Sequence, residues 1–240
     1  MADWFEEWFD GDYAELYAHR DTTEARRAVE LALRVAPELA VGPVLDLGCG
    51  SGRHLEVLRG LNPEAFGMDL SRALLGLASA ELRPWLLRGD MRALPLRPGV
   101  LSGICLWFTP FGYFEDAENR ALLGSLAGLL RPGGAFLLDY LNADLVERTL
   151  VPEDTSERKG TRIWSRRSIE GGRLLKRMTL TSLATGEVRE ALESVQLYHP
   201  AELQDLARAA GLRDRTVLGN YTGEPFTSDS PRWIGIFERT

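Results

Sequence analysis

Three glycines at alternate positions, Gly48, Gly50 and Gly52, mark the part of the chain best suited to hold a ligand. They follow a short apolar run at 44–47 and precede a sequence typical of a helix, so we expect a turn between a buried strand and a helix. Glycine has no Cβ, which lets a ligand lie against the backbone of such a turn. The free N–H groups at the start of the helix favour a carboxylate or a phosphate equally, so the turn alone does not identify the ligand.

The spacing of these glycines differs from that of a dinucleotide-binding turn. The pattern G-x-G-x-x-G would need a third glycine at position 53 or 55, where the chain has Arg53 and Leu55. The chain instead reads D-x-G-x-G-x-G, starting at Asp46. This spacing argues against a nicotinamide-linked oxidoreductase.

Two further acidic residues, Asp69 and Asp90, end the next two apolar runs. A carboxylate in the position of Asp69 can accept both hydrogen bonds from a ribose diol. Each aspartate, taken alone, can equally be a strand-end residue or a helix cap. Their order along the chain, after Asp46, favours one ligand site at the carboxyl edge of a parallel sheet.

Strand and helix patterns alternate over the first part of the chain, which is typical of parallel strands joined by right-handed crossovers. Strands are predicted near 43–47, 65–69, 85–89, 101–107 and 134–140, and helices near 52–60, 71–81 and 117–131. After Asn142 the pattern changes to extended runs separated by short gaps that contain glycine, which indicates hairpins. These runs span 161–168, 173–183 and 188–198, and they precede a helix near 200–210 and strands near 213–219 and 232–238.

The predicted fold is therefore an α/β, doubly wound sheet of seven strands with a small antiparallel β insert after strand five. We expect a single domain over 1–240, with an N-terminal helical cap over 1–40 and the insert over 143–198. Ligands bind beyond the carboxyl ends of parallel strands, and an insert leaving strand five emerges at that edge. The insert is therefore expected to act as a substrate lid.

The composition limits the classes of protein to consider. The 240 residues are 45% hydrophobic and 26% charged, which is typical of a globular domain. No apolar run approaches the roughly 18 residues of a membrane span, and the acidic, aromatic N-terminus is not a secretory signal. Cys49 and Cys105 are interpreted as reduced apolar residues, which favours the cytoplasm. No Cys/His cluster has the spacing of metal ligands.

The charge is negative overall but unevenly distributed. A net charge of −7 argues against broad nucleic-acid binding by the whole surface. Between Arg158 and Arg177, however, there are eight basic residues and one acidic residue, Glu170. The simpler interpretation is the solvated face of a β-sheet, and the alternative is an electropositive wall for an anionic substrate.

The turn and the two later aspartates resemble the class I S-adenosylmethionine-dependent methyltransferases. Residues 44–54 look like motif I of that family, and 86–91 is similar to its adenine-contacting segment. Residues 129–134 and 199–212 resemble the stretch before strand five and the junction of the following helix with strand six. The resemblance implies a Rossmann-like sheet whose last strand is antiparallel, and S-adenosylmethionine as the cofactor.

A narrower resemblance concerns the group within this family. Residues 111–114 and 223–226 look like those of small bacterial methyltransferases with an antiparallel cap, which include sugar-amine N-methyltransferases. Enzymes that methylate DNA bases or glutamine often carry an N/D/S-P-P-Y/F loop after strand four. This chain has Thr-Pro-Phe-Gly at 109–112, which argues against those substrates.

The resemblance also implies roles for individual residues. Asp69 would bind the ribose, Asp90 the exocyclic amine of adenine, and Met91 the adenine ring. The implied cofactor-binding residues are Tyr17, Arg20, Asp46, Gly48, Cys49, Gly50, Gly52, Asp69, Leu70, Asp90, Met91 and Trp107.

Methyl transfer from a sulfonium is an in-line displacement, so most of its rate can come from alignment and the exclusion of water. A general base is needed only for an acceptor that is protonated at neutral pH, and the chain shows no catalytic triad. The candidate catalytic residues are Tyr13, Tyr113, Tyr140 and His199. Tyr13 can instead pack in the core, and His199 can instead cap a helix.

We expect an enzyme that methylates an amine or hydroxyl of a small-molecule acceptor, without a membrane partner. The alternatives are an RNA or protein methyltransferase and a non-catalytic S-adenosylmethionine-binding protein. The aromatic N-terminus, with Trp4, Phe5, Trp8 and Phe9, can pack on the chain's own sheet or on another copy, which leaves a homodimer open.

Overall fold

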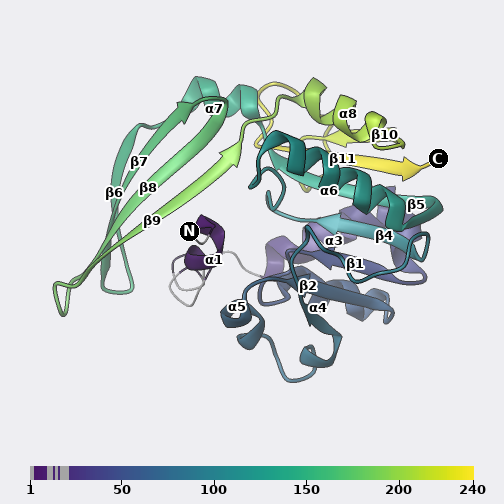
Figure 1. The fold of residues 1–240 in the computed structure, drawn as a ribbon, viewed down its shortest axis with the longest axis horizontal. Coiled ribbons are helices and arrows are strands. Elements are labelled where there is room, and N and C mark those ends of the chain that lie inside the picture. The colour runs from purple at the N-terminus through teal and green to yellow at the C-terminus, as the bar shows by residue number, and fades with distance from the viewer. Residues whose placement is uncertain (1–2, 10–12, 14–15, 17–21) are drawn as a thin grey trace.

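The computed structural model describes residues 3–9, 13, 16 and 22–240 (Figure 1). Its main sheet has seven strands in the order β10-β11-β5-β4-β1-β2-β3. The strands are β1 (Val44–Leu47), β2 (Ala65–Asp69), β3 (Leu86–Arg88), β4 (Leu101–Leu106), β5 (Leu130–Leu141), β10 (Leu212–Leu218) and β11 (Arg232–Arg239). Strand β11 runs antiparallel to both of its neighbours, while β1 to β5 are parallel. The predicted Rossmann-like fold is confirmed.

Helices cover both faces of this sheet because alternate residues of each central strand point to opposite sides. Leu45 and Leu47 belong to one buried cluster, which also holds leucines of α6 and α8, whereas Val44 belongs to a second cluster with α3 and α4. The helices are α3 (Thr22–Val35), α4 (Arg53–Leu61), α5 (Arg72–Gly76), α6 (Asp116–Leu129) and α8 (Pro200–Ala209), with short 3-10 turns η1 (Pro37–Ala40) and η2 (Arg83–Trp85). Helix α5 is shorter than the predicted helix at 71–81.

The insert after β5 is a separate antiparallel sheet that projects from the main sheet (Figure 1). A short helix, α7 (Ala143–Thr149), leads into it. Its strands are β6 (Glu153–Arg158), β7 (Thr161–Glu170), β8 (Arg173–Ser182) and β9 (Val188–Gln196). The sequence predicted β7, β8 and β9 but missed β6, because its six residues are polar and face solvent almost throughout. Strand β6 is held by backbone pairing with β7.

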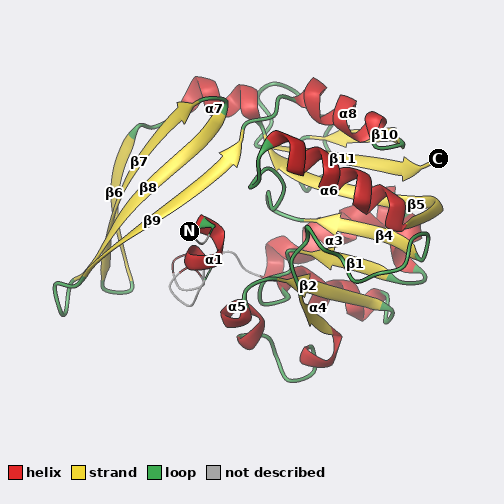
Figure 2. Cartoon of the chain, in the orientation of Figure 1, coloured by secondary structure: helices red, strands yellow, loops and turns green. Residues whose placement is uncertain are grey.

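The N-terminal helix α1 (Trp4–Trp8) lies between the insert and the main sheet (Figure 2). Trp8 is buried in a cluster with Ile163, Met178 and Leu180 of the insert, and its indole Nε1 donates a hydrogen bond of 2.9 Å to Glu193. The aromatic N-terminus therefore packs on the chain's own insert. No helix of the described part of the chain is long and apolar enough to span a bilayer.

Candidate active site

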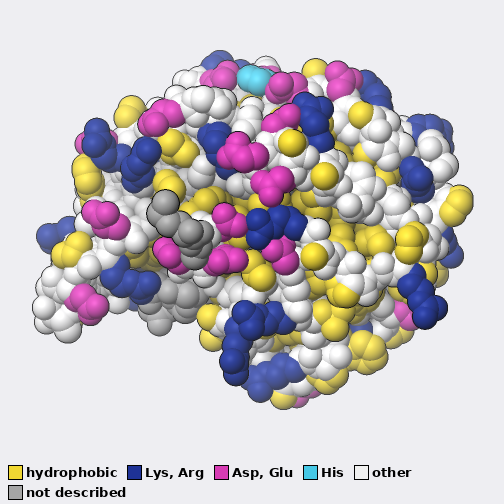
Figure 3. Space-filling model, in the orientation of Figure 1, with side chains coloured by type: hydrophobic (Ala, Val, Ile, Leu, Met, Phe, Trp, Pro, Cys, Tyr) yellow, Lys and Arg dark blue, Asp and Glu magenta, His cyan; other side chains and the backbone are white. Residues whose placement is uncertain are grey.

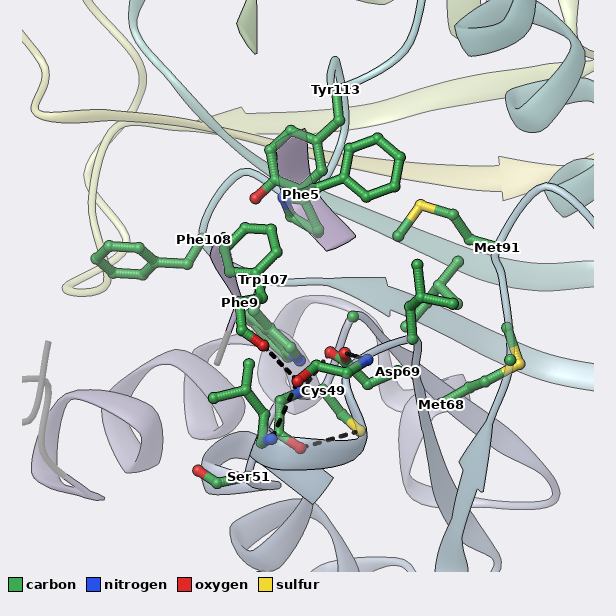
Figure 4. Close-up of a pocket in the computed structure, with 18 of the residues that line it drawn as sticks. Phe5, Phe9, Cys49, Ser51, Met68, Asp69, Met91, Trp107, Phe108 and Tyr113 are labelled. Carbon is green, nitrogen blue, oxygen red and sulfur yellow. Dashed lines mark hydrogen bonds between the residues drawn. The ribbon is translucent and has the colours of Figure 1, made fainter. Parts of the chain in front are cut away.

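A cavity of about 260 Å³ opens at the carboxyl ends of β1, β2, β3 and β4 (Figure 4). The glycine turn after β1 forms its floor, and α1 and the loop after β4 contribute aromatic walls. Its lining includes Phe5, Glu6, Phe9, Tyr13, Gly48, Cys49, Gly50, Ser51, Arg53, His54, Met68, Asp69, Leu70, Ser71, Asp90, Met91, Trp107, Phe108, Pro110, Tyr113 and Phe114.

The glycine turn has the open backbone that a bound ligand needs. Gly48 and Gly50 have φ of +72° and +56°, which side-chain-bearing residues rarely adopt. A Cβ added at Gly48 would lie 3.0 Å from Pro110, a residue of the cavity wall. Gly52 also has positive φ and is required for packing, because its Cβ would collide with Leu82. Gly52 does not line the cavity; it is the N-cap of α4.

Asp69 is held at the end of β2 by the turn itself. Its carboxylate accepts hydrogen bonds from the backbone N–H of Gly50 at 2.7 Å and of Ser71 at 2.8 Å. Burial raises the pKa of Asp69, and these hydrogen bonds oppose the increase. The carboxylate thus has a fixed orientation at the cavity wall (Figure 4).

Asp90 and Met91 lie beyond β3 at the far end of the same cavity. Arg92 pairs with Asp90 at 2.7 Å and with Asp3 of the N-terminal segment at 3.0 Å. Burial works to raise the pKa of Asp90, but the hydrogen bonds from Arg92 outweigh it and lower that pKa. The guanidinium of Arg92 also lies 5.5 Å from the ring centre of Phe5, so α1 is attached to this end of the cavity.

Aromatic rings form a wall of the cavity. The rings of Phe9 and Tyr113 lie 5.6 Å apart, and those of Phe9 and Tyr13 lie 4.7 Å apart. Trp107 stacks on His54, with ring centres 4.9 Å apart and planes inclined by 13°. Figure 4 shows Phe5, Phe9, Trp107 and Tyr113 around the cavity.

The insert contacts the segment that carries Tyr113. Arg173 of β8 donates hydrogen bonds to the carbonyl oxygens of Tyr113 at 2.8 Å and of Phe114 at 2.9 Å. The same guanidinium donates to the hydroxyl of Ser194 in β9 at 2.8 Å. The cavity wall is therefore fixed to the insert through its backbone.

Ten of the residues predicted for the site line this cavity: Tyr13, Gly48, Cys49, Gly50, Asp69, Leu70, Asp90, Met91, Trp107 and Tyr113. Asp46 lies behind the glycine turn, 1% exposed, and its Oδ2 has no hydrogen-bond partner among the described residues. Burial, followed by the charge of Asp69, raises the pKa of Asp46 to about 8. Tyr17 and Arg20 lie outside the described residues.

Tyr140 and His199 are not among the residues that line the cavity. Tyr140 is fully buried, burial raises its pKa, and its hydroxyl donates to the carbonyl oxygen of Gln196. His199 is the N-cap of α8, where its backbone N–H donates to Glu202 at 2.7 Å. Its ring lies 2.8 Å from Asp144, whose hydrogen bond raises the pKa of His199. These contacts match the alternative interpretation of His199 as a helix cap.

Several lining residues were not assigned to the site from the sequence, notably Phe5, Glu6, Phe9, His54 and Ser71. The spacing of the N-terminal aromatic residues indicates a helix with one apolar face. It does not indicate which part of the molecule that face covers, because this contact is formed between segments far apart in sequence.

Residues 44–134 match the family model of a methyltransferase domain. The chain is 27% identical over 216 residues to a cypemycin N-terminal methyltransferase of Streptomyces sp, covering 82% of each protein. It is 28% identical over 218 residues to a dTDP-3-amino-3,4,6-trideoxy-alpha-D-glucopyranose N,N-dimethyltransferase of Streptomyces venezuelae, covering 83% of this chain and 86% of that one. The solved structure of the CcbJ methyltransferase from Streptomyces caelestis has the same fold, with a TM-score of 0.82, 20% identity and full coverage of both chains.

Together, the fold, the cavity at its switch point and these matches support the assignment of the chain as an S-adenosylmethionine-dependent methyltransferase. Three relatives that match over most of their length are named as methyltransferases of an N-terminus, of an amino sugar and of trans-aconitate.

The cavity fits S-adenosylmethionine. The Gly48–Gly50 backbone leaves a cradle that a Cβ would fill, and Asp69 and Asp90 supply acceptors at one end. Strand β1 is central in the sheet, with β2 and β3 on one side and β4 on the other. If Asp69 and Asp90 hold the adenosine, as the resemblance implies, the methionine part would lie toward β4. The cofactor supplies a methyl group activated by the positive charge of its sulfur.

Proposed function

We propose that this enzyme methylates the nitrogen of a small-molecule amine. The observation that carries the proposal is the aromatic wall of the cavity, formed by Phe5, Phe9 and Tyr13 of the N-terminal segment and by Trp107 and Tyr113 after β4. Aromatic faces attract cationic centres. When a neutral amine accepts a methyl group, its nitrogen becomes cationic, so these rings stabilise the charge that develops during the reaction.

The residues of the wall have two tasks in this reaction. The rings keep water away from the reacting groups, and the hydroxyls of Tyr13 and Tyr113 offer hydrogen bonds to the amine, which restrict its orientation. We therefore retain Tyr13 and Tyr113 as the catalytic candidates, because both line the cavity. We further propose that the insert is the lid over the acceptor, since Arg173 fixes the backbone of Tyr113.

Three of the relatives carry names that support an amine acceptor, while another, 29% identical over 202 residues, is a trans-aconitate 2-methyltransferase of Rhizobium meliloti. The names of two relatives that match over most of their length specify methylation of an N-terminus and of an amino sugar. A third, 29% identical over 137 residues, is a dTDP-4-amino-2,3,4,6-tetradeoxy-D-glucose N,N-dimethyltransferase of Saccharopolyspora spinosa. Two rRNA methyltransferases also match, over 35% and 55% of this chain.

The basic run in the insert offers little support for an RNA substrate, because most of its charge is paired locally. Side chains of opposite charge are interspersed over this face of the molecule (Figure 3). The ion pairs within the insert are Arg162–Glu157, Arg166–Glu153, Arg167–Asp154, Lys176–Glu193 and Arg177–Glu170. This arrangement agrees with the solvated face of a sheet.

The test is transfer of label from methyl-labelled S-adenosylmethionine into host-cell extract, separated into small-molecule, RNA and protein fractions. We expect label in the small-molecule fraction. A panel of amino sugars and their hydroxyl counterparts then separates N- from O-methylation, and only the amines should accept label. The variant Tyr113→Phe, which keeps the ring and removes the hydroxyl, should slow transfer to the same amine.

Three outcomes would contradict the proposal. Label in RNA or protein would show that the acceptor is a macromolecule and not a small molecule. Equal transfer to the hydroxyl sugars would show that the methylated atom is not specifically nitrogen. Complete absence of transfer, with S-adenosylhomocysteine still bound, would favour a non-catalytic binding protein.

A further inference from the structure

The loop after β4 adopts an unusual backbone where it borders the cavity. Phe108 and Thr109 have φ of +64° and +69°, in the left-handed region that residues other than glycine rarely adopt. Trp107, Phe108 and Pro110 all line the cavity. Such conformations persist only where the surroundings enforce them, and they are concentrated at functional sites.

Asp139, near the end of β5, is the centre of the contacts that enforce this backbone. Its side chain is fully buried, and its carboxylate accepts a hydrogen bond from the backbone N–H of Phe108 at 2.8 Å. Its own backbone carbonyl accepts one from the N–H of Thr109 at 2.9 Å. Both residues with positive φ are thus bound to a single position in the neighbouring strand.

Two further side chains fix the Asp139 carboxylate. Arg232, at the start of β11, donates from Nε to Asp139 at 2.7 Å and from Nη2 to the hydroxyl of Thr109 at 2.8 Å. Its guanidinium lies 4.8 Å from the ring centre of Phe108. Tyr221 donates its hydroxyl to the second carboxylate oxygen, the one that also accepts from Phe108.

We propose that Asp139 is the positioning residue of the methyl-transfer site. Together with Arg232 and Tyr221, it holds Phe108 and Thr109 in the left-handed conformation and so sets the place of Trp107 and Phe108 against the reacting end of the cavity. Asp139 itself does not line the cavity and acts through the loop. The inference requires methyl transfer but does not depend on which acceptor is used.

The test compares Asp139→Asn and Tyr221→Phe with the wild-type enzyme. Asparagine keeps the size of aspartate, but it cannot accept from Phe108, Tyr221 and Arg232 together, because one of its two terminal groups is a donor. The wall would then shift relative to the reacting atoms, and a misplacement of about 1 Å can cost about 10²-fold in rate. Tyr221→Phe removes one donor and leaves the carboxylate in place, so its loss in rate should be smaller.

The readouts are the initial rate of label transfer from methyl-labelled S-adenosylmethionine into unfractionated host-cell extract, its KM for S-adenosylmethionine, and the calorimetric affinity for S-adenosylhomocysteine. We expect kcat to fall in the order wild type, Tyr221→Phe, Asp139→Asn. The KM and the affinity should change much less than the rate, because Asp69 and Asp90 are unchanged. The rate is measured as the total label transferred per unit time to all acceptors in the extract. The test therefore remains valid even if the acceptor is not an amine.

The matched control is Ile236→Val, a buried substitution in the same strand as Arg232 that touches none of these contacts. It reports the effect of mild destabilisation alone. Rates of Asp139→Asn and Tyr221→Phe within twofold of this control would overturn the proposal. So would an affinity for S-adenosylhomocysteine that falls in step with the rate, because that result describes general disruption of the site.

Discussion

Asp46, within β1, and Asp69, at the end of β2, lie on adjacent strands but have different surroundings. The carboxylate of Asp69 is held by two backbone N–H groups at the cavity wall. Asp46 lies beneath the turn with one oxygen that has no hydrogen-bond partner among the described residues. Because an ionised carboxylate is costly to bury, the pKa of Asp46 rises from 3.8 to about 8.

This raised pKa makes stability depend on pH. Between about pH 4 and 8 the folded protein holds a proton on Asp46 that the unfolded chain has released, so stability decreases as the pH rises through this range. Asp46→Asn cannot ionise. Relative to wild type, its free energy of unfolding should therefore increase with pH, by at most about 1.4 kcal/mol per pH unit. Urea unfolding of the ligand-free proteins at several pH values measures this difference; a constant difference would contradict the assignment.

Asp69→Ala tests the other carboxylate. The substitution removes the carboxylate proposed to accept hydrogen bonds from the ribose, and with it the hydrogen bonds from the backbone N–H groups of Gly50 and Ser71. Hydrogen bonds to a charged group contribute about 1.5–3 kcal/mol each. We expect the affinity for S-adenosylhomocysteine, measured by calorimetry, to fall by about 10²-fold. Asp205→Ala, on the exposed face of α8, is the control and should bind normally. Unchanged binding by Asp69→Ala would mean that the cofactor lies elsewhere.

The positions of the residues expected to bind the cofactor could be derived from the sequence, because these residues follow strand ends in a fixed order. Asp69, Asp90 and the glycines of the turn owe their places to local sequence. The residues on the acceptor side were harder to predict. Tyr113, Tyr140 and His199 all follow predicted strand ends or junctions, yet of these three only Tyr113 lines the cavity. The direction of each side chain there depends on packing between distant segments.

At the scale of elements, α1 joins the cofactor cavity to the insert. Phe5 and Glu6 of this helix line the cavity, while Trp8 packs among apolar side chains of β7 and β8. A helix of five residues has little stability of its own. Its position must therefore depend on these contacts at either end.

Trp8→Ala should release α1 from the insert. Removal of a buried tryptophan side chain costs about 3–5 kcal/mol, so the affinity for S-adenosylhomocysteine should fall by at least about tenfold as Phe5 and Phe9 leave the cavity. The control is Trp164→Ala, because Trp164 is 41% exposed on the insert. Calorimetry compares the two variants. Equal affinities would show that α1 is not held by Trp8.

The elements that the sequence predicted well are those with a buried face. Strands β1, β2 and β4 are continuous or nearly continuous apolar runs, and β7 to β9 are separated by clear turn signals. The sequence did not predict β6 because an exposed edge strand needs no apolar pattern. It overextended α5, which ends at Gly76 after little more than a turn.

At the scale of the whole molecule, the cavity is enclosed by parts that also contact the insert. Helix α1 packs against β9, and Arg173 of β8 binds the backbone beside Tyr113. A ligand that orders the cavity walls should therefore affect the insert as well. This connection joins the cofactor site to the proposed lid.

Hydrogen exchange measured by mass spectrometry can test this connection. Saturating S-adenosylhomocysteine should slow exchange in α1, in residues 107–114 and in β9, because local opening becomes rarer when the cavity is filled. Strand β6, on the far edge of the insert, is the internal control and should not change. Protection limited to the main sheet would show that the insert is independent of the cofactor.

The place of β11 in the sheet has a consequence for biosynthesis. This strand lies between β5 and β10, yet it is synthesised after all the other described strands. Until then, β5 has an unpaired edge, and such edges can associate with other chains. Arg232, the first residue of β11, also supplies a hydrogen bond to Asp139. A nascent chain can therefore form the glycine turn early, but it completes the loop after β4 only once β11 has been synthesised.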